Sequence, residues 1–369
     1  MALLTSSLRP IPTALLRELR SLTLHGPRAK EGLKPVLSVL LAVSVATILN
    51  LDDLFWAAFS GYMVMRGSIA ETIPRGLMRV AGTCSGALLG LLIAPHISDN
   101  PALLMIFLFI VSWIGMFQSL TTKYSYAWVF FGLTATIVLV EVLDSPTSVV
   151  HFAATRVAEV TIGTCACLFI ASLFSDAPID DEGRSGASVW CGRLRELLDE
   201  AWLQTHWPLI EHSTRVALAV ALLPLVWRWF GIEDFSQTAV TSYAVMVVPS
   251  TIVREHRHQT IYERMAHRTL GCFLGSVVAL LCVHLFGTDL PAMLLTLAGG
   301  VWVGYSIQTG REGISYLGTQ FTLGMLITLV QGPGPITDVT PGLYRLLGIF
   351  IGSAMLCLLI LIWPLPRDE

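Results

Sequence analysis

Charged side chains lie inside stretches of this sequence that are otherwise apolar. Arg156 follows the start of one long apolar run and Glu159 comes three positions later, while Glu141 lies near the end of the preceding run. Arg345 has the same place in the last apolar run. A charge that faces lipid at this depth costs at least about 2–3 kcal/mol, so we expect these side chains to face a partner or a water-filled cavity. A guanidinium holds a carboxylate through a planar pair of hydrogen bonds, which indicates binding of an organic anion.

The chain also repeats itself. Asp53 and Tyr62 recur 181 positions later as Asp234 and Tyr243. At an offset of 189 positions, the recurring pairs are Arg75/Arg264, Arg79/Arg268, Gly82/Gly271, Gly86/Gly275, Trp113/Trp302, Arg156/Arg345 and Gly163/Gly352. The step between the two offsets is an insertion of about eight residues in the second copy. A duplicated membrane unit is the usual construction of a secondary transporter.

The two repeats differ in the residue that accompanies their matched arginine. Arg156 and Glu159 could neutralise each other across one helical turn, but the residue that corresponds to Glu159 beside Arg345 is Gly348. Matched arginines with one local carboxylate therefore favour a cationic site near the axis between the halves. In that site Glu159 or Glu141 would take up and release a proton.

Aromatic and amide side chains at matched depths complete the set of candidates. Anchoring at the membrane surface explains most aromatic residues near the ends of spans, but residues paired between the halves are better placed to form a cavity wall. Buried amides need partners, which could be each other, the backbone or a cargo molecule. The candidate substrate-binding residues are Arg156, Arg345, Tyr62, Tyr243, Trp113, Trp302, Gln118 and Gln308, and the candidate proton-coupling residues are Glu159 and Glu141.

Composition makes the lipid bilayer the solvent for most of the chain. Of its 369 residues, 54% are hydrophobic and 13% are charged, and the mean hydropathy is +0.69. A soluble domain carries about 25% charged residues. We expect an all-α integral membrane protein with about 12 transmembrane helices in two parallel six-helix repeats, together with short amphipathic cytoplasmic helices. The expected units are a cytoplasmic segment (1–33), a first repeat (34–175), a cytoplasmic linker (176–212) and a second repeat (213–369).

Basic residues alternate along the connections between the apolar runs. The N-terminal segment, the linker and every second connection carry Lys or Arg, and Arg228 is the one clear exception. By the positive-inside rule both termini are cytoplasmic. The amphipathic stripe from Trp190 to Trp202 in the linker predicts a helix that lies on membrane lipid. A surface for a homodimer or another partner is the alternative.

Several kinds of chemistry have no support in the sequence. There is no GxxxxGK[ST] loop for ATP, and no CxxC or Cys/His spacing typical of a metal site. The run from Arg254 to His258 reads as a solvated basic loop. We expect no cofactor, no metal, no nucleic-acid partner and no enzymatic activity. Glycines four positions apart, such as Gly82 and Gly86, predict close helix packing.

The first half resembles the fusaric acid resistance and aromatic acid exporter family. The resemblance rests on Gly32-Leu33-Lys34, on Phe55-Trp56-Ala57 in a short aromatic-rich second span, and on Arg75 to Gly82, an Arg-x3-Arg-x2-Gly motif that begins a Gly-x3-Gly span. A final span with Arg156 and Gly163 completes the pattern, and the second half matches more weakly. The resemblance implies proton-coupled export of aromatic carboxylic acids across a bacterial inner membrane, with a periplasmic adaptor subunit in many systems.

Three functional hypotheses follow. The first is an inner-membrane secondary transporter that exports aromatic or other organic acids. The second is a passive organic-anion channel, because plant malate channels look like distant relatives of the same six-span unit. The third is a membrane scaffold or regulator that does not transport.

Overall fold

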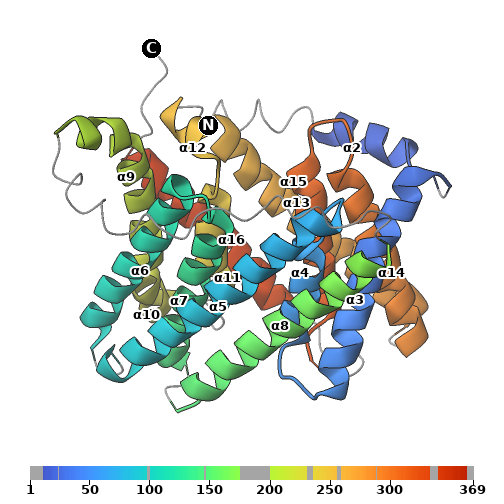
Figure 1. The fold of residues 1–369 in the computed structure, drawn as a ribbon, viewed down its shortest axis with the longest axis horizontal. Coiled ribbons are helices and arrows are strands. Elements are labelled where there is room, and N and C mark those ends of the chain that lie inside the picture. The colour runs from blue at the N-terminus through green and yellow to red at the C-terminus, as the bar shows by residue number, and fades with distance from the viewer. Residues whose placement is uncertain are drawn as a thin grey trace.

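The computed structural model describes residues 11–23, 25–97, 100–144, 147–174, 200–230, 236–255, 259–287, 289–332 and 340–363, and every regular element in them is an α-helix (Figure 1). The first half contains α2 (Ile11–Arg20), α3 (Pro27–Ile48), α4 (Leu54–Val64), α5 (Ile69–Ile97), α6 (Pro101–Thr121), α7 (Ser125–Asp144) and α8 (Val149–Leu173). The second half contains α9 (Glu200–Ala221), α10 (Leu223–Phe230), α11 (Ser236–Met246), α12 (Ser250–Arg254), α13 (Gln259–Phe286), α14 (Leu290–Gln308), α15 (Ser315–Leu329) and α16 (Thr340–Ile362).

Among the described residues, nine helices are long and apolar enough to cross a membrane. The all-helical fold class is therefore confirmed. Three predicted spans are instead short: α4 and α11 have 11 residues each and α15 has 15, whereas a crossing needs about 20. All three are enclosed by protein, since every residue of α4 except Met63 is buried, as are Gln237–Tyr243 and Leu317–Leu329. A short helix is tolerated at membrane depth where protein or a cavity surrounds it.

Helix contacts recur between the two halves. Helix α5 packs on α7 as α13 packs on α15, and α4 packs on α8 as α11 packs on α16. The contacts that join the halves are reciprocal as well. Helix α3 packs on α14 while α9 packs on α6, and α4 contacts α15 while α11 contacts α7. The short helices α4 and α11 consequently lie at the centre of the bundle (Figure 1).

The predicted glycine stripes lie where backbones approach each other. A Cβ atom added at Gly86 would lie 3.1 Å from the Ala135 backbone nitrogen, and one added at Gly275 would lie 3.0 Å from that of Met325. Both contacts leave no room for a larger side chain. The seams α5–α7 and α13–α15 therefore depend on these glycines.

We predict that Gly86→Leu destabilises the protein by about 1–3 kcal/mol, because the new side chain must push α7 away from α5. Thermal melting of the purified protein in detergent measures the effect. Ser85→Leu is the matched control, since Ser85 is the preceding residue and faces outward. Equal melting temperatures for the two variants would contradict this account of the seam.

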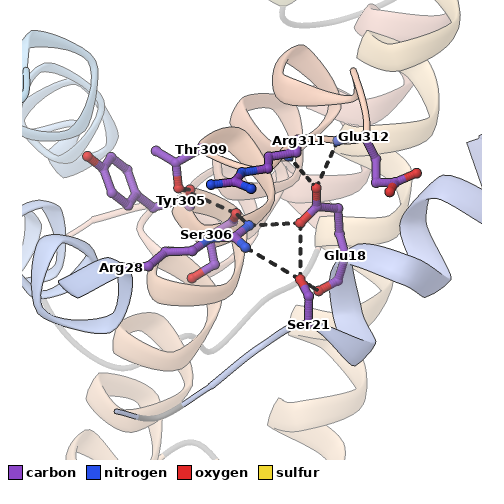
Figure 2. Close-up of polar contacts among 8 residues, drawn as sticks. All are labelled: Glu18, Ser21, Arg28, Tyr305, Ser306, Thr309, Arg311 and Glu312. Carbon is purple, nitrogen blue, oxygen red and sulfur yellow. Dashed lines mark hydrogen bonds and ion pairs between the residues drawn. The ribbon is translucent and has the colours of Figure 1, made fainter. Parts of the chain in front are cut away.

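Helix α2 docks on the second half through a buried carboxylate (Figure 2). Glu18 is 3% exposed. Its Oε1 accepts hydrogen bonds from the backbone N–H groups of Arg311 at 2.6 Å and Glu312 at 2.9 Å, in the turn between α14 and α15. Its Oε2 accepts one from Arg28 Nη2 at 2.8 Å, and the same nitrogen donates to the carbonyl of Ser306. Ser21 Oγ also donates to Oε2, at 3.3 Å, so four donors meet at one carboxylate.

Apolar contacts complete this docking. Ile11 and Ala14 of α2 belong to a buried cluster with Ile307 and Leu317 of the second half. The predicted N-terminal amphipathic helix therefore rests on protein along its apolar face. Most of the corresponding linker helix, predicted from Trp190 to Trp202, lies outside the described residues.

Docking of α2 should depend on pH. Burial by itself raises the pKa of Glu18, but the hydrogen bonds from Arg28 and from the Glu312 and Arg311 amides outweigh it, and the pKa lies below the ordinary glutamate value. A carboxylate whose pKa is lowered on folding stabilises the folded state above its unfolded pKa of about 4.3. That stabilisation is lost as the pH falls through the lower folded value.

We predict that Glu18→Gln speeds hydrogen exchange at the Arg311 and Glu312 amides at neutral pH, because a neutral amide is a weaker acceptor than a carboxylate. Wild-type exchange at these amides, corrected for its intrinsic pH dependence, should approach that of the variant in acid. Slow exchange in the variant at neutral pH would show that the carboxylate does not hold the turn.

Candidate functional site

A cavity of about 510 Å³ lies at the centre of the bundle. Helices of both halves form its walls, with α4 and α11 facing each other across it and α5, α7, α13, α14 and α15 around them. Four arginines line it, together with a belt of aromatic rings. None of the described residues that line it is Asp or Glu. The basic lining residues are Arg66, Arg75, Arg264 and Arg268, and the aromatic ones are Phe55, Trp56, Phe59, Tyr62, Tyr126, Phe130, Tyr305 and Tyr316.

The first arginine of each Arg-x3-Arg motif caps a short helix. Arg75 Nε donates to the carbonyl of Met63 at 3.0 Å, in the last turn of α4. Arg264 donates from Nε to the carbonyl of Val245 and from Nη2 to that of Ala244, both at 3.2 Å, in the last turn of α11. The last carbonyls of a helix have no partner within it and carry partial negative charge, which a cation satisfies.

Tyrosine rings hold both capping guanidiniums in place. Arg75 Cζ lies 3.7 Å from the ring centre of Tyr126 at the start of α7, and Arg264 Cζ lies 4.0 Å from that of Tyr316 at the start of α15. Cation–π contacts of this kind stabilise by about 0.5–2 kcal/mol, with the higher value where water is excluded.

The second arginine of each motif lies one helical turn deeper. Arg268 is 3% exposed, and it donates from Nε and Nη2 to Thr241 Oγ1 at 3.2 and 3.1 Å and from Nη1 to Gln320 Oε1 at 2.9 Å. In the first half, Arg79 donates from Nη2 to Ser60 Oγ at 3.0 Å. Both arginines therefore bind a hydroxyl of the adjacent short helix.

Two residues predicted to bind substrate meet at the cavity. The hydroxyl of Tyr62 donates to Gln308 Oε1 and accepts a hydrogen bond from Thr322 Oγ1 at 3.2 Å. Tyr62 and Gln308 both line the cavity. They also join α4 to α14 and α15, so they belong to the contact between the halves as well.

The other predicted aromatic residues lie between helices rather than on the cavity wall. Tyr243 is buried with its hydroxyl against Gly115 and Gly132, between α6 and α7. Trp113 Nε1 donates to Thr214 Oγ1 in α9, and Trp302 Nε1 donates to the carbonyl of Ala29 in α3, each at 3.2 Å. The two tryptophans thus tie the first helix of each half to the opposite half. None of the three is a lining residue.

The predicted charged site forms an ion-pair group beside the start of α4. Arg156 Nη1 lies 3.3 Å from Glu159 Oε2 and 3.7 Å from Asp53 Oδ2, and Glu159 Oε1 accepts the Asp53 N–H at 2.9 Å. Arg156 also lies over the ring of Trp56, with Cζ at 4.3 Å from its centre. Since Trp56 lines the cavity, this group lies behind the cavity wall.

Two predicted residues are not among those that line this cavity, and a third lies outside the described side chains. Glu141 lies on α7 and Gln118 on α6, and neither is a lining residue. Arg345 belongs to α16, but its side chain lies outside the described residues.

The arginines of the two Arg-x3-Arg motifs are evident in the sequence, where Arg75, Arg79, Arg264 and Arg268 mark the repeat but are not predicted site residues. The missed signal is their spacing, because four positions on a helix place two guanidiniums on one face.

We predict that Arg264→Leu destabilises the protein by about 1.5–3 kcal/mol, because two carbonyls at the end of α11 lose a charged donor. Thermal melting and limited proteolysis measure the change. Arg20→Leu is the control, since Arg20 is exposed at the end of α2. If both variants have the melting temperature of the wild type, the hydrogen bonds of Arg264 to the end of α11 do not contribute to stability.

Known proteins resemble this chain over part of its length. YdhK of Escherichia coli K12, an uncharacterized transporter, is 30% identical over 140 residues, which are 36% of this chain and 21% of that protein. Inner membrane protein YeeA of the same organism is 29% identical over 155 residues, 42% of this chain and 41% of YeeA. The p-hydroxybenzoic acid efflux pump subunit AaeB, also from E. coli, is 28% identical over 164 residues, 41% of this chain and 25% of AaeB.

The matched segments thus span less than half the length of each of these relatives. No solved structure matches the chain. The profile of the fusaric acid resistance protein family matches residues 32–228, which is more than half of the sequence and runs from α3 to α10. This match confirms the resemblance carried by the short aromatic second span and the Arg-x3-Arg motif: the chain belongs to the fusaric acid resistance protein family.

Proposed function

We propose that this protein is an inner-membrane secondary transporter that exports aromatic or other organic acids. One observation carries the proposal: the central cavity is lined by four arginines and by aromatic rings, and by no Asp or Glu among the described residues. Such a cavity concentrates anions, because its fixed charges have one sign and its walls exclude water. The aromatic rings favour an anion that carries an apolar or aromatic group.

The architecture proposed for transport is a pair of parallel six-helix repeats. Helices α3 to α8 form the first repeat, and α9, α11, α13, α14, α15 and α16 form the second, within the proposed units 34–175 and 213–369. Both termini are proposed to be cytoplasmic. The reciprocal contacts of α3 with α14 and of α9 with α6 support this arrangement. A cavity between two repeats that move relative to each other is the usual basis of alternating access.

The names of the relatives support the direction and cargo of transport. YdhK is named a transporter, and AaeB is named a subunit of an efflux pump for p-hydroxybenzoic acid. The word subunit also supports a partner protein, for which a periplasmic adaptor is our proposal. Proton coupling is proposed at Glu159, because protonation there would break its ion pair with Arg156 and change the surroundings of Asp53.

We predict that proteoliposomes with the purified protein release benzoate or p-hydroxybenzoate, and that Arg66→Gln and Arg268→Gln each raise the KM by roughly threefold to tenfold, because each variant removes one positive charge from the cavity wall. The measurement is efflux of labelled acid with and without a proton gradient. Arg156→Gln, made in parallel, tests the ion-pair group as a second anion site.

Distinct results separate the competing functions. A current that follows only the anion's own gradient, and persists in Glu159→Gln, would identify a passive channel. Wild-type liposomes that release neither acid would contradict a transporter of these substrates and favour a scaffold or regulator.

A further inference from the structure

Arg79 is a buried cation with an incomplete set of partners. It is 0% exposed. Nη2 donates to Ser60, but Nε and Nη1 have no hydrogen-bond acceptor among the described residues. No described Asp or Glu forms an ion pair with it. The hydroxyl of Tyr126 lies close enough to Arg79 for a weak polar contact, although outside good hydrogen-bond geometry, and it is neutral, so no described anion compensates the charge.

The equivalent arginine in the second half, Arg268, has a complete set of hydrogen-bond acceptors. Arg268 finds acceptors for all three of its nitrogens in Thr241 and Gln320. Phe130 occupies the position that corresponds to Gln320, at an offset of 190 that also relates Tyr126 to Tyr316. One substitution between the halves therefore removes the internal acceptor from the first.

Two phenyl rings stand where that acceptor would be. Arg79 Cζ lies 3.6 Å from the ring centre of Phe130 and 4.6 Å from that of Phe59. Their π faces offset only part of the cost of burying a charge that has no counterion. Among the described residues, the guanidinium therefore lacks an anion.

The cavity lies directly beyond these rings. Phe59, Phe130 and Tyr126 all line it, while Arg79 itself does not. Phe130 packs edge to face against Tyr126, with ring centres 4.7 Å apart. A turn of the Phe130 side chain would open Arg79 to the cavity and leave an aromatic-walled space beside it.

We propose that Arg79 is the carboxylate-binding residue of a covered site for an aromatic acid in the first half. The carboxylate accepts the free N–H groups of Arg79, and the ring of the acid takes the place of Phe130 against Phe59 and Tyr126. The second half has no such site, because Gln320 already fills it from within. This inference rests on the proposed transport of organic acids, and it assigns one site to each chain.

Exchanging the acceptor tests the site. Phe130→Gln gives Arg79 the internal partner that Gln320 gives Arg268, and we expect it to weaken benzoate binding at least about tenfold, since a charged hydrogen bond contributes about 1.5–3 kcal/mol. Phe130→Leu is the matched control: it opens the site without supplying an acceptor and should bind benzoate within about threefold of wild type. Arg79→Gln should abolish binding.

Calorimetry on the purified full chain in detergent measures affinity and stoichiometry, with benzamide as the neutral analogue. We expect one benzoate per chain and no benzamide. Benzoate binding by Phe130→Gln with wild-type affinity, or two benzoates per wild-type chain, would overturn the proposal.

Efflux assays distinguish failure of the Arg79 site from failure of the proposed transport function. If wild-type liposomes release benzoate and folded Arg79→Gln does so equally well, the site is wrong and transport stands. If the wild type releases none, the transport proposal fails first.

Discussion

The arginines and tyrosines around the central cavity are there because two short helices, α4 and α11, end inside the bundle. The carbonyls in the last turns of α4 and α11 have no partner within these short helices, so each needs a donor from elsewhere in the protein. Arg75 and Arg264 supply those donors from the neighbouring helices α5 and α13. This requirement brings positive charge to the centre of the molecule, where a tyrosine ring covers each guanidinium. The cavity lies along the two short helices, which both contribute to its wall.

The same requirement sets the character of the cavity. A capping arginine on α5 or α13 places the residue four positions later on the same face one turn deeper, and that residue is again arginine in both halves. Arg79 and Arg268 each bind a hydroxyl of the capped helix, Ser60 and Thr241 respectively. With no described carboxylate on the wall, the charge of these groups is left for an anion to balance. The anion recognition that we propose is in this sense a consequence of how the ends of the short helices are capped.

Much of the fold was predictable from the sequence, but among the predicted site residues with described side chains only Tyr62 and Gln308 line the cavity. The short aromatic second span is α4, and the glycine spacing marks one side of the α5–α7 seam. Hydropathy does not show which protein groups surround a short helix, so it could not assign the arginines that cap α4 and α11. Recurrence in both halves predicts a cavity wall, yet Trp113 and Trp302 recur because each ties the halves together.

Residues that keep the two repeats together are expected to be the same in both, whereas residues that form a single binding site are not. The two tryptophans match because the contacts that they make between the halves are reciprocal. The capping arginines and their tyrosines match because each half has a short helix to cap. A single site for one molecule has no such need, since one copy of the repeat suffices to form it. Phe130, at the position that corresponds to Gln320, breaks the repeat on the cavity wall, on α7 and α15 from opposite halves. In a duplicated transporter, cavity-lining residues that differ between the two repeats are therefore the ones from which to infer substrate specificity. Residues that are identical in both repeats mainly maintain the fold.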